Sequence, residues 1–248
     1  MTIATRFPTG LYGITPDWSD FDRLYHAIEQ ACAAGLPILQ WRRKHTPFEL
    51  ACEQARRVAL CCQHHGTLFV VNDDWRLALE VGADAVHLGR DDGDIQEAKA
   101  DIAAASKHLL IGVSCYNQIE LAQQAIANEV DYFAFGAVFP STVKPDAVHA
   151  PLHLFEEAKQ LLTASLSPQL PNSMLNASDT TATVDSLDMI LTPPTRPTIV
   201  GIGGITLSNA KQVIDAGADS IAVISGLFET ADIYQTCKDF MTLFATKH

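Results

Sequence analysis

Short apolar runs alternate with longer amphipathic stretches along nearly the whole chain. The runs are almost continuously hydrophobic, which is typical of parallel strands covered on both faces. They predict strands at residues 11–15, 37–41, 67–72, 85–88, 109–114, 132–139, 198–203 and 220–225. The intervals have helical periodicity, as in residues 47–65 and 117–127. The first of these helices is predicted to carry Pro47 at its first position and to end at Gly66.

Eight strand–helix units indicate a (β/α)₈ barrel, the TIM-barrel fold of the α/β class. A weak internal repeat supports it, because VGADAVHLG, NEVDYFAFG and AGADSIAVI each join a helix end to a strand. The main alternative is a doubly wound open sheet, which has less support because no GxGxxG motif follows the first strand. We expect a single domain over residues 1–248, since barrels of this length are common.

One segment interrupts the alternation. Residues 163–197 are rich in Ser, Thr, Pro and Asn, and they have no clear period. We predict a flexible insertion between the sixth helix and the seventh strand. Because it follows a helix, it is expected at the end of the barrel away from the active site.

Composition limits the possible partners. The formal net charge is −12, so neither nucleic acid nor an anionic membrane is an expected partner. The six cysteines form no CxxC pair, and most fall among apolar residues, as expected of buried thiols in a reducing compartment. No apolar segment is long enough for a leader peptide or a membrane span, so a cytoplasmic location is predicted. A homo-oligomer is compatible with the sequence.

The second predicted strand ends in LQWRRKH, and side chains alternate along a strand. Gln40, Arg42 and Lys44 should therefore share one face, at the end of the barrel where active sites form. Trp41 and Arg43 should share the other. The cations could be ordinary loop charges, but two cations and an amide in strict alternation favour an anion site in an acidic protein.

Two strings, VVNDDW and HLGRDD, each end an apolar run with a pair of aspartates. Aspartates at such places often cap helices. In a barrel, however, these strands are neighbours, and one carboxylate from each could share a cation. Mg²⁺ binds few carboxylates and takes further oxygens from water and phosphate, which would suit a diphosphate substrate. His87, inside the fourth strand, is interpreted as an interior histidine with satisfied hydrogen bonds.

Other strand ends add polar groups and glycines. Ser114 ends the fifth strand, and GIGGIT and VISG end the seventh and eighth, where loops often form a phosphate site. The loop after the sixth strand carries two hydroxyls and a cation, Ser141, Thr142 and Lys144. Together they predict a diphosphate site with a metal and a second site for a monophosphate. No Ser-His-Asp or Cys-His arrangement proposes a nucleophile.

The sequence resembles the thiamine-phosphate synthase family in GLYGITPD, LQWRRK, VVNDD, GADAVHLGRDD, IGVSCYN, FGAVFPSTVKPDA and GIGGIT…AGADSIAVISG. That family condenses 4-amino-2-methyl-5-hydroxymethylpyrimidine diphosphate with 4-methyl-5-(2-phosphoethyl)thiazole by a dissociative substitution, with Mg²⁺. The resemblance implies that Asp73 and Asp92 hold the metal, which leaves Asp74 as a helix cap and Asp91 as a loop carboxylate. It implies pyrimidine diphosphate contacts from Gln40, Arg42, Lys44, Asn72, Ser114 and Lys144, of which Arg42, Lys44 and Lys144 would be catalytic. It implies thiazole phosphate contacts from Ser141, Thr142, Val143, Gly204, Ile224 and Ser225.

One departure from the family concerns the thiazole phosphate site. Val143 stands where the family usually has Thr, and the lost hydrogen bond to a charged group would cost roughly 1.5–3 kcal/mol. Thr142 could compensate if the loop shifts by one residue. The alternatives are a thiazole tautomerase of the same fold, a non-catalytic thiazole-phosphate-binding protein, and a metal-dependent lyase of phosphorylated sugars.

Overall fold

Eight parallel strands close into a barrel in the computed structural model, which describes residues 4–44, 46–140, 147–166 and 195–245. Around the barrel the strand order is β10-β2-β3-β4-β5-β6-β7-β9. The strands are β2 (Gly10–Ile14), β3 (Ile38–Trp41), β4 (Leu68–Asn72), β5 (Ala85–Leu88), β6 (Leu110–Tyr116), β7 (Tyr132–Gly136), β9 (Thr198–Ile202) and β10 (Ser220–Val223). The predicted TIM barrel is confirmed, and each predicted apolar run overlaps one strand, although β2 begins one residue earlier and β6 ends two residues later than predicted.

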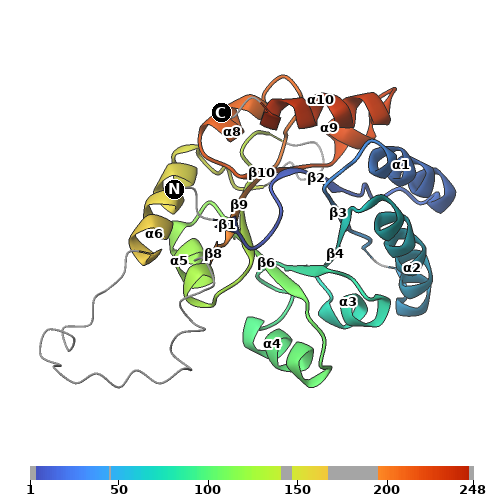
Figure 1. Cartoon of the computed structure of the whole chain (residues 1–248), viewed down its shortest axis with the longest axis horizontal. Helices are drawn as coiled ribbons and strands as arrows, with labels where there is room; N and C mark the ends of the chain where they lie inside the picture. The colour runs from blue at the N-terminus through green and yellow to red at the C-terminus, as the bar shows by residue number, and fades with distance from the viewer. Residues whose placement is uncertain (1–3, 45, 141–146, 167–194, 246–248) are drawn as a thin grey trace, which may run out of the picture.

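Helices form a ring outside the strands (Figure 1). They are α1 (Phe21–Ala33), α2 (Phe48–His65), α3 (Trp75–Val81), α4 (Ile95–Ala104), α5 (Ile119–Ala127), α6 (His153–Leu166), α8 (Ala210–Asp215), α9 (Ser225–Phe228) and α10 (Ile233–Ala245). The predicted start of α2 was wrong by one position, because Pro47 is its N-cap in an extended conformation and not its first helical residue. The predicted end is confirmed, since Gly66 has a φ of 71° and closes the helix in the left-handed conformation.

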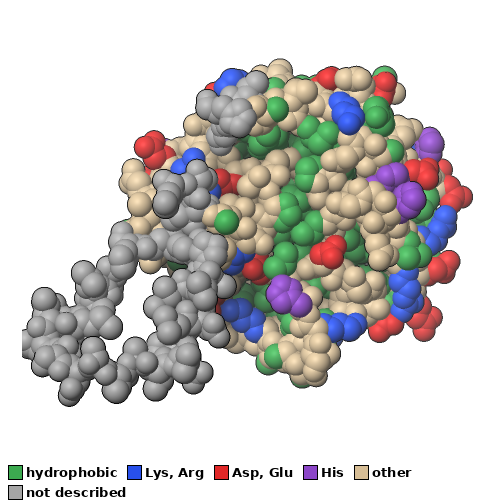
Figure 2. All heavy atoms as spheres, viewed as in Figure 1, with side chains coloured by type: hydrophobic (Ala, Val, Ile, Leu, Met, Phe, Trp, Pro, Cys, Tyr) green, Lys and Arg blue, Asp and Glu red, His purple; other side chains and the backbone are tan. Residues whose placement is uncertain are grey.

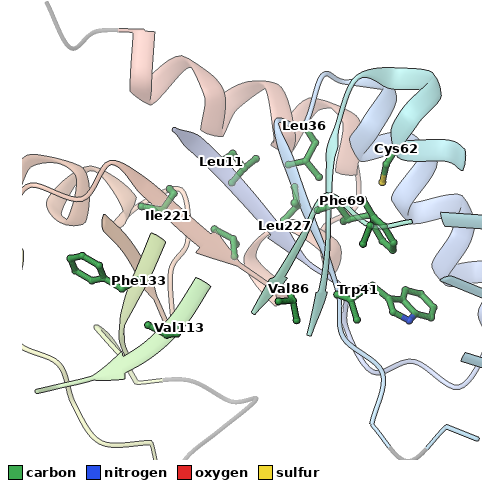
Figure 3. Packing of buried hydrophobic residues seen from close by; sticks show 14 of the residues in the cluster. Leu11, Leu36, Trp41, Cys62, Phe69, Val86, Val113, Phe133, Ile221 and Leu227 are labelled. Atoms are coloured by element: carbon green, nitrogen blue, oxygen red, sulfur yellow. The ribbon is translucent and has the colours of Figure 1, made fainter. Parts of the chain in front are cut away.

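Two hydrophobic layers follow from the alternation of side chains along the strands. The larger layer packs the outer faces of the strands against the helices, and Figure 3 shows Leu11, Trp41 and Phe69 within it. The smaller layer fills the interior of the barrel with Phe7, Tyr12, Ile14, Ile38, Val70, Ala85, Tyr132, Ala134, Val200 and Ala222. The interior is therefore a packed core over which the strand ends carry the polar groups.

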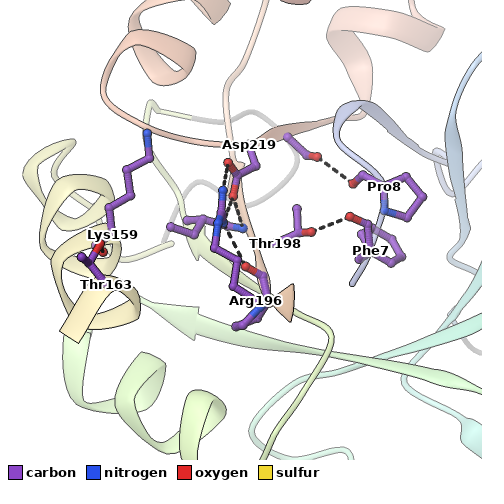
Figure 4. A network of polar contacts seen from close by, with 10 residues as sticks. Phe7, Pro8, Lys159, Thr163, Arg196, Thr198 and Asp219 are labelled. Atoms are coloured by element: carbon purple, nitrogen blue, oxygen red, sulfur yellow. Dashed lines mark hydrogen bonds and ion pairs between the residues drawn. The ribbon is translucent and has the colours of Figure 1, made fainter. Parts of the chain in front are cut away.

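The N-terminal end of the barrel is closed by residues 4–8. Strand β1 (Ala4–Thr5) pairs in parallel with β8 (Thr195–Arg196), and Arg196 makes a two-pronged ion pair with Asp219 at 2.6 and 2.7 Å. Phe7 then enters the barrel interior, where its carbonyl oxygen accepts a hydrogen bond from the Thr198 hydroxyl at 2.6 Å (Figure 4). Residues 4–8 therefore form a plug at the N-terminal end of the barrel interior.

The bounds of the predicted insertion at 163–197 need correction at both ends. Helix α6 continues through Thr163 to Leu166, because its apolar periodicity extends further than the Ser/Thr-rich composition suggested. Thr195 and Arg196 form β8 because they pair with β1. A pairing with residues so far away in the chain cannot be predicted from the local sequence pattern. Both ends lie at the N-terminal side of the strands, as expected; the rest of the segment lies outside the described residues.

Burial and charge agree with the composition. All six cysteines are free and buried, as predicted. Acidic and basic side chains are interspersed around the periphery of the face in Figure 2. In the described parts of the chain, no helix has both the length and the apolar character needed to cross a membrane.

Candidate active site

A cavity of about 440 Å³ opens at the C-terminal ends of the barrel strands. It brings together eight of the predicted site residues: Gln40, Arg42, Lys44, Asn72, Asp73, Asp92, Ser114 and Ile224. A larger hollow of about 610 Å³ lies between α6 and α8, on the outside of the barrel and away from these strand ends. We assign the site to the first cavity, because active sites of this fold form at the C-terminal ends of the strands.

The end of β3 places its side chains as the alternation predicted. Gln40, Arg42 and Lys44 line the cavity, whereas Trp41 packs outward against the ring of Phe21 on α1. The turn after the strand is fixed by Thr15, whose hydroxyl accepts a hydrogen bond from the Arg42 backbone N–H at 2.8 Å. The two cations are therefore presented at one wall of the cavity by a well-anchored backbone.

Asp73 and Asp92 meet at the next part of the rim. Their strands, β4 and β5, are paired with Asn72 opposite His87, and the Asp73 N–H donates to the His87 carbonyl at 2.8 Å. Burial, together with the adjacent Asp92 carboxylate, raises the pKa of Asp73 from 3.8 to about 6, although Lys44 and Arg42 partly offset this. Two carboxylates this close repel one another unless a proton or a cation lies between them.

Asp74 and Asp91 have the places predicted for them, as a helix cap and a loop carboxylate. The Asp74 carboxylate accepts hydrogen bonds from the N–H groups of Arg76 and Leu77, at 2.9 and 3.0 Å, and caps helix α3. Asp91 lies in the turn after β5 and lines the cavity. The turn after β5 orients the Asp92 carboxylate, because one of its oxygens accepts a hydrogen bond from the Gly89 N–H at 2.7 Å.

A chain of hydrogen bonds crosses the floor of the cavity. Gln40 Nε2 donates to the Tyr12 hydroxyl at 2.8 Å, and the hydroxyls of Tyr12 and Tyr132 are 2.9 Å apart. His87 continues the chain, with Nδ1 3.1 Å from the Tyr132 hydroxyl and Nε2 2.9 Å from the Ser114 hydroxyl. The prediction that His87 is a satisfied interior histidine is confirmed.

Tyr116 lines the cavity, although no pattern in the sequence predicted it there. It ends β6 after a break in register at Ser114, with a φ of 53°, which is rare for a bulky side chain. Its hydroxyl accepts a hydrogen bond from the Arg90 N–H at 3.1 Å, and the Arg90 guanidinium lies 4.8 Å from the ring centroid. Tyr116 therefore supports the turn that carries Asp92.

The glycine-rich ends of β9 and β10 lie side by side, and their glycines have a packing role. A Cβ on Gly204 would lie 2.3 Å from the Pro140 carbonyl oxygen, and one on Gly226 would lie 2.4 Å from the Ile205 carbonyl oxygen. Glycine at these two positions thus lets neighbouring loops approach each other closely. Gly204 and Ser225 adjoin the cavity through Gly203 and Ile224, which line it.

Four predicted site residues, Ser141, Thr142, Val143 and Lys144, lie outside the described residues. The cavity also contains residues that sequence reasoning missed, including Tyr12, Ile14, Ala134, Val200 and Ala222. Strand alternation could have found Tyr12 and Ile14, since they occupy the inward positions of β2.

Comparison with known proteins identifies the family. The model of the thiamine monophosphate synthase family matches residues 11–171 and 174–227. The chain belongs to this family. It is 46% identical over 240 residues to thiamine-phosphate synthase of Bordetella bronchiseptica, covering 97% of both chains. It is 43% identical over 223 residues to the thiamine-phosphate synthase of Chromobacterium violaceum, covering 90% of both chains.

A solved structure of the family has the same architecture. Thiamine phosphate pyrophosphorylase from Pyrococcus furiosus superposes with a TM-score of 0.73 at 26% identity, covering 97% of both chains. Membership of the thiamine monophosphate synthase family supports a transferase of thiamine biosynthesis that acts on small molecules. The cavity at the strand ends is the site at which such chemistry can take place.

Proposed function

We propose that the chain condenses 4-amino-2-methyl-5-hydroxymethylpyrimidine diphosphate with 4-methyl-5-(2-phosphoethyl)thiazole, forming thiamine phosphate and pyrophosphate in an Mg²⁺-dependent reaction. One observation carries this proposal: Asp73 and Asp92 form a carboxylate pair beside the cations Arg42 and Lys44 at the mouth of the cavity. A carboxylate pair next to cations suits a metal-bound diphosphate, in which the metal and the cations share the phosphate oxygens.

The donor set fits a hard divalent cation. Burial, and then the neighbouring Asp92 carboxylate, raises the pKa of Asp73, so a cation bound by both carboxylates would favour their charged forms. No group of three or more His, Cys, Asp or Glu side chains is placed to hold a metal ion among the described residues, so a metal here would rely on Asp73, Asp92, water and substrate. When bound, Mg²⁺ would supply positive charge to the diphosphate oxygens.

The remaining predicted residues divide between the two substrates. Arg42 and Lys44 would bind the diphosphate and stabilise the charge that develops as pyrophosphate departs, with Lys144 as a third cation. Gln40, Asn72 and Ser114 would hold the pyrimidine from the floor and walls of the cavity. The thiazole phosphate would lie at the loops after β7, β9 and β10, where the predicted contacts are Ser141, Thr142, Val143, Gly204, Ile224 and Ser225.

The proposed substitution is dissociative. The electron-rich aminopyrimidine delocalises the positive charge on its methylene carbon once the bond to the diphosphate breaks, and the thiazole nitrogen then forms the new bond. This route requires no protein nucleophile. The protein would orient the two rings, neutralise the charge of the departing pyrophosphate and keep water away from the pyrimidine methylene cation.

A direct assay tests the proposal. The purified protein is mixed with both substrates and MgCl₂, and thiamine phosphate and pyrophosphate are measured separately. We expect equal amounts of the two products and none when either substrate is omitted. Binding of the thiazole phosphate without turnover would instead support the non-catalytic binding protein, and isomerisation of a thiazole substrate alone would support the tautomerase.

A further inference from the structure

Tyr132 lies beneath the cavity and has no part in the reaction as proposed. It is fully buried on β7, and its hydroxyl lies between the Tyr12 hydroxyl at 2.9 Å and His87 Nδ1 at 3.1 Å. Through these two partners it connects Gln40 on β3 with Ser114 on β6, which β4 and β5 separate in the barrel. A single hydroxyl thus joins the polar groups of two distant walls.

We propose that Tyr132 is a positioning residue that fixes the orientation of the Gln40 amide and of the Ser114 hydroxyl, and thereby selects a pyrimidine that carries an amino group. The inference rests on the proposed pyrimidine substrate and deepens it. It assigns part of the choice between an amino and an oxo substituent to the Tyr132 hydroxyl, which does not line the cavity.

The Gln40 end of the chain determines which amide atom faces the ligand. Because Nε2 donates to the Tyr12 hydroxyl, the Oε1 atom of the same amide points away from Tyr12. Gln40 lines the cavity, and the atom of its amide that can accept a hydrogen bond from a ligand there is Oε1. An exocyclic amino group can donate to this oxygen, whereas an oxo group in the same place would face it with another acceptor.

The Ser114 end is held through His87. A neutral imidazole has one donor nitrogen and one acceptor nitrogen, and the hydrogen bond at one nitrogen sets the role of the other. With the Tyr132 hydroxyl at Nδ1 and the Ser114 hydroxyl at Nε2, the direction of the first bond decides the direction of the second. The donor or acceptor role of Ser114 toward a ligand is therefore linked to Tyr132.

This linkage resists inversion of the Gln40 amide. An inverted amide would present oxygen to Tyr12, which would then have to donate its one proton to Gln40 and could only accept from Tyr132. Burial raises the pKa of both tyrosine hydroxyls, so each keeps its one proton and cannot adapt by ionising. Several buried bonds would have to change together, which favours a single arrangement.

The variant Tyr132→Phe removes the linking hydroxyl, and with it one hydrogen bond each of Tyr12 and His87, but keeps the aromatic packing. The ring of Tyr132 stacks on Phe7 with centroids 4.0 Å apart and on His87 with centroids 5.5 Å apart, and phenylalanine retains both contacts. Tyr12→Phe is the second variant, since it removes the hydroxyl that accepts from Gln40. Tyr234→Phe, at an exposed tyrosine of α10, is the matched control.

The experiment measures dissociation constants by calorimetry, with MgCl₂ present and the thiazole absent. The two ligands are the aminopyrimidine diphosphate and the analogue with an oxo group in place of the amino group. For wild type and Tyr234→Phe we expect the same strong preference for the amino ligand. In Tyr132→Phe, affinity for the amino ligand should fall about five- to tenfold, and the preference should shrink by about tenfold because the amide can then invert. The dissociation constant of the thiazole phosphate, measured separately, should be unchanged.

Three outcomes are decisive. A folded Tyr132→Phe protein with the wild-type preference would refute the inference and leave the proposed function intact. If Tyr132→Phe does not fold, Tyr12→Phe decides on the same two ligands, and an unchanged preference there refutes the inference. A wild-type protein that binds neither pyrimidine would refute the proposed substrate and the inference with it.

Discussion

Replacing Asp73 with asparagine should stabilise the metal-free protein at neutral pH. The folded state raises the pKa of this carboxyl from 3.8 to about 6, through burial and then through Asp92. A shift of about two units corresponds to about 3 kcal/mol, and partial exposure of the site to solvent reduces this to about 1–2 kcal/mol. Asparagine is neutral, can donate a hydrogen bond to Asp92, and tolerates the φ of 70° found at this position.

The dependence on pH follows from the sign of the shift. Because the folded pKa is raised, the carboxyl contributes no penalty below about pH 4, where it is protonated in both the folded and the unfolded state. The penalty grows as the pH rises toward the folded pKa and is constant above it. The stability advantage of Asp73→Asn should therefore appear between about pH 4 and pH 6 and persist at pH 7.5.

The assay is thermal and urea unfolding in EDTA across this pH range, with Asp91→Asn as the control. At pH 7.5 the melting temperature of Asp73→Asn should exceed that of wild type by roughly 2–8 °C, since about 1 kcal/mol shifts it by about 2–4 °C in a chain of this size. Millimolar MgCl₂ should then raise the melting temperature of wild type but not of Asp73→Asn. The electrostatic reasoning would be refuted if the gain in stability of Asp73→Asn over wild type were the same at every pH. It would also be refuted if the variant were less stable than wild type at pH 7.5.

Three further predictions follow from the site and the barrel. Asp92→Ala should abolish most activity and the Mg²⁺ dependence, whereas Asp91→Ala should keep most of both; equal losses in steady-state assays would contradict the ligand assignment. Lys44→Ala should lower kcat/KM for the pyrimidine diphosphate by about a hundredfold or more, with little change in KM for the thiazole, and an effect confined to the thiazole would contradict its place at the diphosphate. Gly112→Ala should lower the free energy of unfolding, measured in urea, by about 2–3 kcal/mol, because the new Cβ would lie 1.9 Å from the Tyr132 ring. An unchanged free energy of unfolding would show that the Tyr132 ring can move aside at little cost.

The parts of the site that could be predicted depend on regular geometry. Alternation along β3 was enough to place Gln40 on the cavity wall, and continuing it beyond the strand end at Trp41 also placed Arg42 and Lys44 there. Asp73 and Asp92 could be placed together because they follow β4 and β5, which are neighbours in the barrel. Both inferences use only the strand period and the order of strands in a barrel.

The parts that could not be predicted depend on local irregularity or on long-range contact. The left-handed conformation of Tyr116 arises at a break in the register of β6, which leaves no mark in the hydrophobic pattern. The hydrogen bonds between Tyr12, Tyr132 and His87 join strands far apart in the chain, so no sequence window contains them. The glycines at 204 and 226 were correctly placed at the strand ends, but their packing partners are carbonyl groups of other loops.

The plug beneath the barrel has a consequence for the synthesis of the protein. The carbonyl of Phe7 receives its hydrogen bond from Thr198, 191 residues later, and that of Pro8 from Ser220, 212 residues later. The N-terminal segment leaves the ribosome long before Thr198 and Ser220 have been synthesised. Phe7 therefore cannot reach its native environment until almost the whole chain has been made. Contacts this distant in sequence are slow to form, and the last step of folding is expected to be the arrival of β9 and β10 at the first residues of the chain.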